Sequence, residues 1–507
     1  MNKIKSRLAV TAVLLTVVAI AATACQTASG QTVPAAPATT TTSQQASPVQ
    51  PTATPTATPT TIAYTGRFSL SPTKAAPGAS VKATGSGFDP NQKLEIVWQG
   101  FQGSWNTNSA GEFHGRTFKN DLLPEATVTT DASGSFETSF TVPSGFGFEH
   151  DVLVQNGSAT VNKAGFQVQM QASVSPSSGP LGTPITINLN GVGWRSLENS
   201  WMILYDNKFT GWMSSVTTGG VAQAVIPAVG SPGTHIIQII HGSATFPYLN
   251  MQQSPQPDRP SWTFQFTVTD GQAVLPSPAQ SQGLPIVSGS GAAVTGGPAI
   301  WTDPLSAPVG TPAVLKGSGL PTGQTVEILW FRMVGSRVSG QGYAEDSTSL
   351  GTTSVDASGN IAFPFKALDD LGGAHRIEVH LNGQKIAETS FTISPSAFAI
   401  DPASGPAGTK LTIHLKGVGW TQTANIYTLV YDNAYVGYAC GFNSQGDVTV
   451  YLPATGEPGW HFIDLYPGIY QGDDMQTTND FRIPQLTYTD HPGEKLPAFH
   501  FAFQITG

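Results

Sequence analysis

A phrase that recurs at a fixed distance constrains the fold of this chain more than any other feature. The string "ILYDNKFTGW" at 203–212 returns as "LVYDNAYVGY" at 429–438, with Tyr-Asp-Asn and a later glycine kept 226 residues apart. The longer string "SPSSGPLGTPITINLNGVGW" at 175–194 returns as "DPASGPAGTKLTIHLKGVGW" at 401–420, at the same offset. A constant offset over so many positions indicates that one structural module, here called type B, occurs twice.

A second repeat, type A, precedes each copy of type B. Its matching strings are "PGASVKATGSGF" (77–88) with "VGTPAVLKGSGL" (309–320), "KLEIVW" (93–98) with "TVEILW" (325–330), and "DASG" (131–134) with the same letters at 356–359. The offset falls from 232 for the second string to 225 for the third, so seven residues (232 − 225) were gained or lost in the loop between them. The order A, B, A, B indicates that an A–B pair was duplicated.

Composition sets the predicted limits of the modules. Gly, Ser, Pro and Ala predominate over residues 272–297, as in a flexible linker. Thr and Pro dominate residues 25–66 almost without charge, and such a segment buries too little apolar surface to fold, so we expect a disordered stalk there. The predicted modules are A1 at 67–169, B1 at 170–271, A2 at 298–395 and B2 at 396–507.

Each module has the residue pattern of short β-strands. "SVKATGSGF" and "TPITINLNGVGW" alternate apolar and polar residues, which is the period of half-buried strands. Asn156-Gly157 and Asn382-Gly383 lie between such segments and are strong hairpin signals, because both central positions of that turn need positive φ. Modules of about 100 residues with about seven strands predict an all-β chain of four tandem immunoglobulin-like β-sandwiches.

The opening of the type B module carries a family resemblance. Ser-Pro or Asp-Pro, then Gly-Pro-x-Gly, a β-branched strand and "GVGW" resemble bacterial immunoglobulin-like modules of the IPT/TIG kind. The resemblance implies a β-sandwich without catalytic residues of its own. It also implies the settings in which these modules occur, namely extracellular adhesins, appendages of surface enzymes, and spacers.

Residues 1–24 have the pattern of an export signal. Lys3, Lys5 and Arg7 precede the apolar run "LAVTAVLLTVVAIAA", and small residues then lead to Cys25. This resembles the bacterial lipoprotein signal, which implies that acyl chains such as palmitate are attached to Cys25. We therefore expect an exported protein anchored by lipid to the bacterial cell membrane and facing outside. An ordinary secretory signal cleaved near Ala24 is the alternative.

Cysteine and charge content exclude several classes. Cys25 and Cys440 are the two cysteines of the chain, so an acylated Cys25 leaves Cys440 without an intrachain disulfide, and its role stays open. Charged residues make up 11% of the chain with a net charge of −9, and no basic run predicts nucleic-acid binding.

The repeated Tyr-Asp-Asn has two interpretations, a turn or a ligand site. Asp and Asn suit a turn because they bond to nearby backbone and tolerate left-handed φ. Tyr205 and Tyr431 fall on the strand face expected to be buried. The turn interpretation explains every repeated letter and is favoured.

A histidine precedes an apolar strand in every module. Because these histidines lie in separate modules, they cannot converge on a zinc ion, which needs three or four ligands. We expect each to be a hydrogen-bonded residue at the start of a strand. They are His150, His235, His375 and His461.

Several aromatic residues are candidates for either core packing or sugar stacking. Trp194 and Trp420 end the "GVGW" strings and are predicted to pack in the sandwich cores. Trp212 and Tyr438 follow the Tyr-Asp-Asn turns and are candidates for stacking on sugar rings, with core packing as the alternative.

Two long excursions in the type B modules are the main functional candidates. They cover 241–261 in B1 and 467–498 in B2, far longer than a hairpin loop, and they mix aromatic and amide side chains suited to recognition. The alternative is a long but inert β-excursion. In B2, aspartates including Asp480 and Asp490 also raise the possibility of calcium binding, although no EF-hand spacing is present. The candidate binding residues on the excursions are Tyr248, Asn250, Tyr470, Asp473 and Asp474.

The chain contains none of the enzyme motifs sought: no Gly-x-Ser-x-Gly elbow, no His-Glu-x-x-His, no P-loop and no dinucleotide fingerprint. We therefore expect a non-catalytic protein without cofactor or metal, acting in adhesion or in binding an extracellular polysaccharide or surface protein through the type B excursions. A carbohydrate-binding protein with exposed aromatic rings is one alternative, and a spacer or scaffold in the cell envelope is the other.

Overall fold

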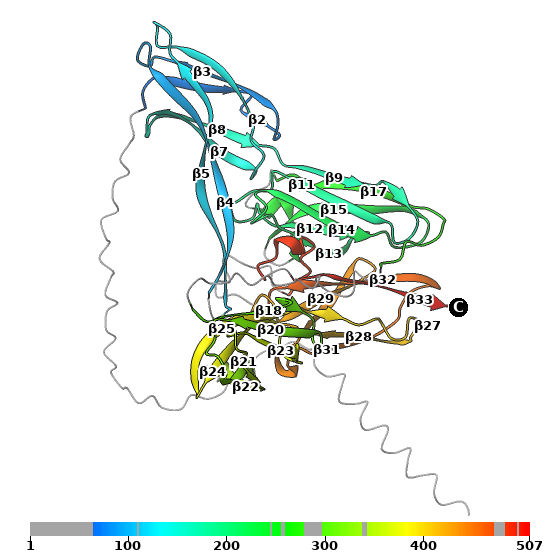
Figure 1. Ribbon diagram of the computed structural model, residues 1–507. Helices are drawn as coiled ribbons and strands as arrows, with labels where there is room; N and C mark the ends of the chain where they lie inside the picture. The colour runs from blue at the N-terminus through cyan, green and yellow to red at the C-terminus, as the bar shows by residue number, and fades with distance from the viewer. Residues whose placement is uncertain are drawn as a thin grey trace, which may run out of the picture. The chain divides into compact units, whose positions relative to one another are not determined.

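A computed structural model describes residues 64–108, 111–243, 246–254, 259–277, 297–336, 342–470, 482–493 and 496–507. The signal, Cys25 and nearly all of the predicted stalk lie outside these ranges, as does residues 278–296 of the predicted linker. In the described part no helix is long and apolar enough to cross a membrane. The secondary structure there consists of strands and three-residue 3-10 turns (Figure 1), so the prediction of an all-β chain is confirmed.

The first type A module, A1, is a sandwich of a three-stranded sheet, β1–β3–β6, and a five-stranded sheet, β2–β8–β7–β4–β5. Its long hairpin β4–β5 extends out of the sandwich (Figure 1). The strands are β1 (Arg67–Ser71), β2 (Lys74–Ala75), β3 (Ser80–Ser86), β4 (Lys93–Thr107), β5 (Phe113–Thr129), β6 (Phe136–Thr141), β7 (Phe148–Asn156) and β8 (Ala159–Val168).

The second type A module, A2, repeats this topology with the sheets β18–β20–β23 and β19–β25–β24–β21–β22. Its strands are β18 (Ala299–Asp303), β19 (Ser306–Ala307), β20 (Pro312–Ser318), β21 (Thr325–Ser336), β22 (Gly342–Ser354), β23 (Ile361–Lys366), β24 (Gly373–Leu381) and β25 (Gln384–Ile393).

The first type B module, B1, pairs β14–β11–β9 with β10–β17–β15–β12–β13, and β16 is added to β15. Its central hairpin β12–β13 is much shorter than that of A1. The strands are β9 (Gln171–Ser175), β10 (Ser178–Gly179), β11 (Pro184–Asn190), β12 (Trp201–Tyr205), β13 (Lys208–Met213), β14 (Val221–Pro227), β15 (Gly233–Ser243), β16 (Phe246–Pro247) and β17 (Trp262–Val268), and the turn η1 spans Met251–Gln253.

The second type B module, B2, has the sheets β26–β28–β31 and β27–β33–β32–β29–β30. Its elements are β26 (Ser396–Ala397), β27 (Ser404–Pro406), β28 (Lys410–Lys416), β29 (Ile426–Tyr431), β30 (Ala434–Cys440), η3 (Phe442–Ser444), β31 (Val448–Pro453), β32 (Gly459–Gly468), η4 (Tyr488–Asp490) and β33 (Phe499–Thr506). Every module therefore has two facing sheets, and the predicted fold class of repeated immunoglobulin-like sandwiches is confirmed.

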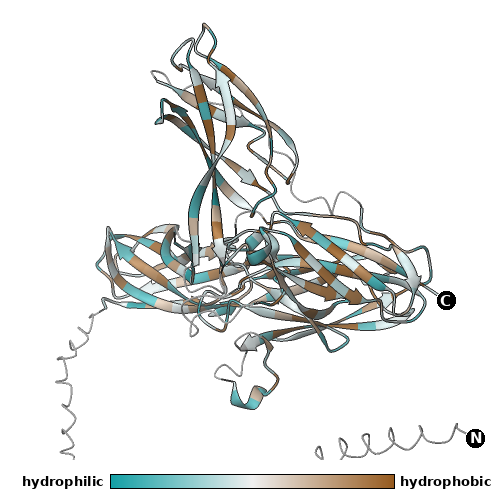
Figure 2. Ribbon diagram, turned by 90° about the horizontal axis from the view of Figure 1, so that it is seen from below, coloured by the Kyte–Doolittle hydropathy of each residue, from teal (hydrophilic) through white to brown (hydrophobic). Residues whose placement is uncertain are grey.

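Alternation along the strands supplies the cores. In β11 the residues alternate between buried and part-exposed, with Ile185, Ile187 and Leu189 pointing inward. Figure 2 shows hydrophobic and hydrophilic residues alternating along many strands. The B1 core does not end at its own module, because Val430 and Phe462 of B2 belong to the same buried cluster. B1 and B2 thus share apolar packing.

The repeated Tyr-Asp-Asn lies at the bend of a hairpin in both copies, so the turn interpretation is confirmed. Asp206 and Asn207 have φ of 48° and 63°, and the two matching residues of B2 have φ of 46° and 57°. This is the left-handed backbone of a two-residue hairpin turn. The Tyr205 hydroxyl donates to the Val229 carbonyl at 2.9 Å, and Tyr431 makes the matching bond to Thr455 at 2.8 Å.

All the strand-start histidines are hydrogen-bonded, as predicted. The ring nitrogen Nε2 of each contacts the carbonyl oxygen of the residue four positions earlier, at 2.8–2.9 Å. In the type A modules the ring stacks on a core tryptophan, as His150 does on Trp98 with centroids 4.8 Å apart. In the type B modules Nδ1 contacts the turn aspartate, as His461 does with Asp432 at 2.6 Å. These histidines are structural.

Candidate functional site

The long excursion of B2 packs against B1. Its residues 484–486 pair with Trp212 of β13: the Trp212 amide donates to the Pro484 carbonyl and the Leu486 amide donates to the Trp212 carbonyl, both at 2.8 Å. Ile483, Gln485 and Leu486 are each about 99% buried, with 1% exposed. The hypothesis of an exposed recognition loop is therefore wrong for the described part of 467–498, because its apolar residues are buried against the neighbouring module.

Asp490 fastens this excursion to B1. Its carboxylate accepts hydrogen bonds from the Ser214 hydroxyl (2.7 Å), the Val216 amide (2.8 Å), and the amide and hydroxyl of Thr217 (2.7 and 2.5 Å). Asp490 is 2% exposed. The carboxylate that we considered as a calcium ligand is thus used up by donors of B1. In the described part of the chain no three His, Cys, Asp or Glu side chains are placed to hold a metal, and Asp480 lies outside that part.

The long hairpin of A1 closes over the same junction. The Trp105 indole donates to the Asp490 carbonyl oxygen at 2.5 Å, and the Phe113 amide donates to the Gln422 side chain at 2.7 Å. Phe113 is buried in a small cluster that also contains Trp212 of B1 and Ile483 of B2. Three modules therefore meet in one apolar cluster, which holds B1 and B2 in a defined arrangement.

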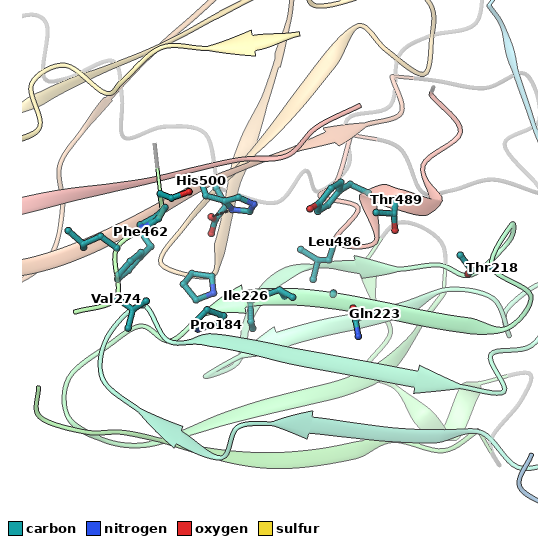
Figure 3. A pocket seen from close by; sticks show the side chains of 18 of the residues that line it. Pro184, Thr218, Gln223, Ile226, Val274, Phe462, Leu486, Thr489 and His500 are labelled. Carbon is teal, nitrogen blue, oxygen red and sulfur yellow. Dashed lines mark hydrogen bonds and ion pairs between the residues drawn. The ribbon is translucent and has the colours of Figure 1, made fainter. Parts of the chain in front are cut away.

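A cleft of about 840 Å³ lies between B1 and B2 beside this junction (Figure 3). We call it the B1–B2 cleft. One wall is formed by β11 and β14 of B1, and the other by β32, β33 and the excursion of B2. Its main lining residues are Pro184, Val221, Gln223, Val225, Ile226, Val274, Leu275, Phe462, Asp464, Leu486, Tyr488, Thr489 and His500.

The cleft has apolar walls and one charged corner. Val221 and Val225 of the edge strand β14 are 42% and 45% exposed and line the B1 wall. At the corner, Nδ1 of His500 contacts Oδ1 of Asp464 at 2.6 Å. Asp464 is 3% exposed, and its Oδ2 has no hydrogen-bond partner among the described residues. Few polar groups in a mostly apolar cleft are the usual composition of a ligand pocket.

The two partners at this corner affect each other's protonation. Burial opposes a charged His500 ring, but the hydrogen bond and negative charge of Asp464 outweigh it and raise the pKa of His500. Burial likewise raises the pKa of the adjacent Tyr466 hydroxyl far above its ordinary value. The ring of His500 and the ring of Tyr466 are edge to face, with centroids 6.0 Å apart.

Comparison of the two type B modules shows that the fold does not require this corner. Asp464 pairs with His500 across β32 and β33, and the equivalent pair across β15 and β17 of B1 is Gln238 with Thr263. The same sandwich therefore forms without an ionisable pair at these positions. Sequence reasoning missed Asp464 and His500, although aligning B1 with B2 position by position would have singled out the first of them.

The structure buries one of the two turn-following aromatics and exposes the other. Trp212 is 0% exposed under the B2 excursion, so it is not available to stack on a sugar ring, and that candidate is corrected. Tyr438 is 42% exposed on β30, with the Arg482 guanidinium 5.4 Å from its ring centre. Tyr470 is half-buried, and the same guanidinium lies 4.6 Å from its ring.

The B1 excursion is the exposed one of the two. Tyr248 is half-buried and Asn250 is exposed. The neighbouring Phe246 and Leu249 are 54% and 76% exposed, which leaves an apolar surface on this loop. The remaining candidates, Asp473, Asp474 and the lipidation site Cys25, lie outside the described residues.

Trp194 and Trp420 are not core residues, contrary to the prediction. Trp194 is half-buried and stacks on Phe101 of A1, with ring centroids 3.9 Å apart. Trp420 is placed equivalently against Tyr343 of A2, at 6.1 Å. Both lie at the A–B contact because the "GVGW" segment ends at the edge of the sandwich, where the long type A hairpin meets it.

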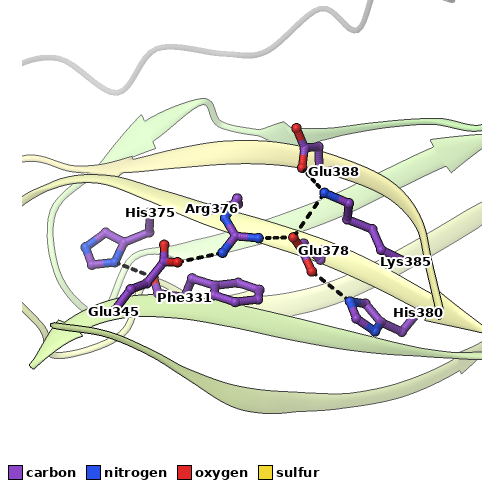
Figure 4. Close-up of polar contacts among 8 residues, drawn as sticks. All are labelled: Phe331, Glu345, His375, Arg376, Glu378, His380, Lys385 and Glu388. Carbon is purple, nitrogen blue, oxygen red and sulfur yellow. Dashed lines mark hydrogen bonds and ion pairs between the residues drawn. The ribbon is translucent and has the colours of Figure 1, made fainter. Parts of the chain in front are cut away.

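A group of charged side chains on A2 is internally paired (Figure 4). Arg376 contacts Glu345 at 2.7 Å and also Glu378, and it lies over a phenylalanine ring. The carboxylate of Glu378, 4% exposed, also contacts His380 at 2.7 Å and Lys385 at 3.5 Å. These charges satisfy one another on one sheet face, so we assign them a structural role.

No protein-family model and no characterised protein sequence matches the chain. Three solved structures resemble it weakly. The first is Salmonella alpha-2-macroglobulin reacted with methylamine, with 11% identity, 87% of this chain covered, 31% of that chain covered and a TM-score of 0.19. The second is invasin, a bacterial integrin-binding protein (10%, 87%, 79%, 0.18), and the third is the ICAM-5 D1–D4 ectodomain fragment (11%, 80%, 95%, 0.17). This chain spans about a third of the macroglobulin's length. At these TM-scores, none of these structures carries an argument about what this chain binds.

Proposed function

We propose that this protein is an exported, non-catalytic binding protein, anchored through lipid on Cys25 to the outer side of a bacterial cell membrane, that takes up a ligand in the B1–B2 cleft. The observation that carries the proposal is the combination of apolar walls with the Asp464–His500 corner. A buried ionisable pair is costly to keep, and the duplicate module lacks it. Selection for a ligand explains its presence at the cleft.

The lining indicates the chemistry of the ligand. The walls offer Val225, Leu486 and Phe462, which suit an apolar body. Nδ1 of His500 is engaged by Asp464, and its Nε2 has no partner among the described residues, so the protonated ring can donate one hydrogen bond into the cleft. A mainly apolar ligand with one anionic or carbonyl oxygen fits this arrangement.

Titration with anilinonaphthalene sulfonate, an apolar probe with one anionic group, tests the proposal. We expect saturable binding to the mature chain with a stoichiometry of one. Val225→Arg fills the B1 wall with charge and abolishes this binding. Val436→Arg is the matched control, because Val436 is 58% exposed and does not line the cleft. Equal binding by both variants would exclude the cleft as the site.

His500→Gln separates the polar corner from the apolar walls. The glutamine removes the cationic donor, so we expect about tenfold weaker probe binding at pH 6 and a smaller difference at pH 9, where His500 is neutral. Thr263→Ala changes the equivalent position of B1 and serves as control. A pH-independent effect of His500→Gln would contradict the assigned donor role.

The exposed B1 excursion supports a second candidate function, adhesion to a surface protein. Phe246 and Leu249 form an apolar surface there, of the kind that marks protein contacts. Leu249→Asp should abolish attachment to partner cells while leaving probe binding in the cleft intact. Carbohydrate binding through the exposed ring of Tyr438 is the remaining alternative, and a glycan array with Tyr438→Ala tests it. A spacer would pass both tests unchanged.

A further inference from the structure

A buried guanidinium lies at the base of the B1 excursion, far from the role of the B1–B2 cleft. Arg259 is 6% exposed, and its guanidinium carbon lies 4.6 Å from the ring centre of Trp201. None of its three side-chain nitrogens has a hydrogen-bond partner among the described residues. Burial lowers the pKa of Arg259 to about 9, and the charge of Glu198 opposes this shift. Arg259 is therefore a charged group with unmet hydrogen-bonding capacity.

His241 lies beside it in the same condition. It is 3% exposed on β15, and neither ring nitrogen has a partner among the described residues. Burial and the positive charge of Arg259 lower the pKa of His241 to about 4, so the ring is neutral at pH 7. A neutral imidazole offers one donor and one acceptor. The Tyr248 ring lies 6.3 Å from the His241 ring, on the side of the excursion.

Glu198 does not neutralise Arg259 on its own, because it is engaged elsewhere. Its Oε1 accepts from Nε of Arg195 at 2.9 Å and also contacts Nη2 of Arg195 at 2.5 Å. The charges of Arg195 and Glu198 balance, which leaves the charge of Arg259 unmatched within this group.

The type B fold does not need this cluster. Trp201 pairs with His241 across β12 and β15, and the equivalent pair of B2 is Tyr427 with Pro467. Glu198 is replaced by an alanine at the corresponding position of B2, 226 residues later. B2 forms the same sheets with uncharged residues. An unpaired buried arginine destabilises a fold, so its presence in B1 alone points to a ligand.

We propose that Arg259 and His241 form a binding site for a sugar acid, with the carboxylate held by the guanidinium and an adjacent hydroxyl held by His241. The planar fork of arginine matches the two oxygens of a carboxylate. The neutral imidazole can accept from a hydroxyl or donate to it. Trp262 is half-buried, with its ring 5.5 Å from that of Trp201, and supplies an aromatic face for a sugar ring. An acidic peptide has no need of such rings and is the less favoured source of carboxylate.

The test measures thermal unfolding of the mature chain with D-glucuronate and with D-glucose, its uncharged counterpart. A ligand that binds the folded state alone raises the unfolding temperature in a saturable manner. We expect this rise with glucuronate, and not with glucose, for the unaltered chain and for Arg67→Met, an exposed arginine in A1. Arg259→Met should abolish the rise while leaving the ligand-free unfolding temperature unchanged or higher, because an unmatched buried charge has been removed.

Several results would overturn the proposal. A response of Arg259→Met to glucuronate, or an equal response of the unaltered chain to glucose, removes the role of the charge. An equal response to inorganic sulfate or to an acidic peptide replaces the sugar acid with another anion. If Arg259→Met does not fold, Arg259→Lys keeps the charge without the fork and should weaken glucuronate binding at least tenfold. Binding of anilinonaphthalene sulfonate in the B1–B2 cleft should be unaffected by either variant, which separates this site from the proposed function.

Discussion

Replacing Asp490 by asparagine should loosen the B2 excursion from B1, and the geometry allows the effect to be estimated. Each carboxylate oxygen of Asp490 accepts from one backbone amide and one hydroxyl of B1, within the pairs Ser214/Val216 and Thr217. The amide group of an asparagine has one accepting oxygen, and its NH₂ group cannot accept. The hydroxyls can rotate to accept from this NH₂ group, but the backbone amide facing it cannot.

The variant therefore loses one charge-assisted hydrogen bond, worth about 1.5–3 kcal/mol, and leaves one buried amide unpaired, which costs about 1–3 kcal/mol. The sum is roughly 3–5 kcal/mol of local stability. Because about 1.36 kcal/mol corresponds to a factor of ten, amide exchange in the excursion should accelerate by a factor on the order of 10² to 10³ or more.

Hydrogen exchange followed by mass spectrometry on peptides within 482–493 and 213–217 measures this opening directly. Asp131→Asn is the matched control, because Asp131 accepts from the amide and hydroxyl of Ser133 and the amide of Ser135 but is exposed to solvent. We expect faster exchange in both B-module peptides for Asp490→Asn and little change at the junction for Asp131→Asn. Equal protection of 482–493 in both variants would refute the clamp.

Three further changes test the packing of B1 on B2. His491 is 7% exposed and burial lowers its pKa to about 3, so the unfolded chain binds its proton near pH 6.5 while the folded chain does not; stability should fall by up to about 1.4 kcal/mol per pH unit between those values, and His491→Gln should reduce that slope in urea denaturation at stepped pH. Asn433→Gly keeps the left-handed turn but removes a 2.8 Å bond to the Pro227 carbonyl, so it should cost about 1–2 kcal/mol, whereas Asn207→Gly at the exposed equivalent should cost little in the same assay. Trp212→Ala should lower the free energy of unfolding by about 3–5 kcal/mol, and an unchanged calorimetric transition would contradict its burial.

Features that depend on neighbours in the sequence or on one hairpin were predictable. The Tyr-Asp-Asn turn follows from the tolerance of Asp and Asn for positive φ, and both copies adopt it. The strand-start histidines were predicted to be hydrogen-bonded, and their partners lie four residues away. The sandwich class follows from alternation, which is a local pattern as well.

Features that depend on contacts between modules were not predictable. The composition of the B2 excursion, rich in aromatic and amide side chains, is the same for a loop that binds another protein and a loop that docks on its own chain. Leu486 bonds to Trp212, more than 270 residues away, and no periodicity reports such a contact. Trp194 was placed in the core for the same reason, although its partner is Phe101 of the preceding module.

The sequence by itself determined what each module is: two copies of two sandwiches, with hairpin turns and apolar faces set by residues close together in the chain. The tertiary structure alone decided which aromatic rings are exposed, which excursion is covered, and where the cleft with Asp464 and His500 opens. The physical reason is that burial of an exposed face depends on the shape of the module opposite it. That shape is encoded hundreds of residues away and acts only after both modules have folded and met.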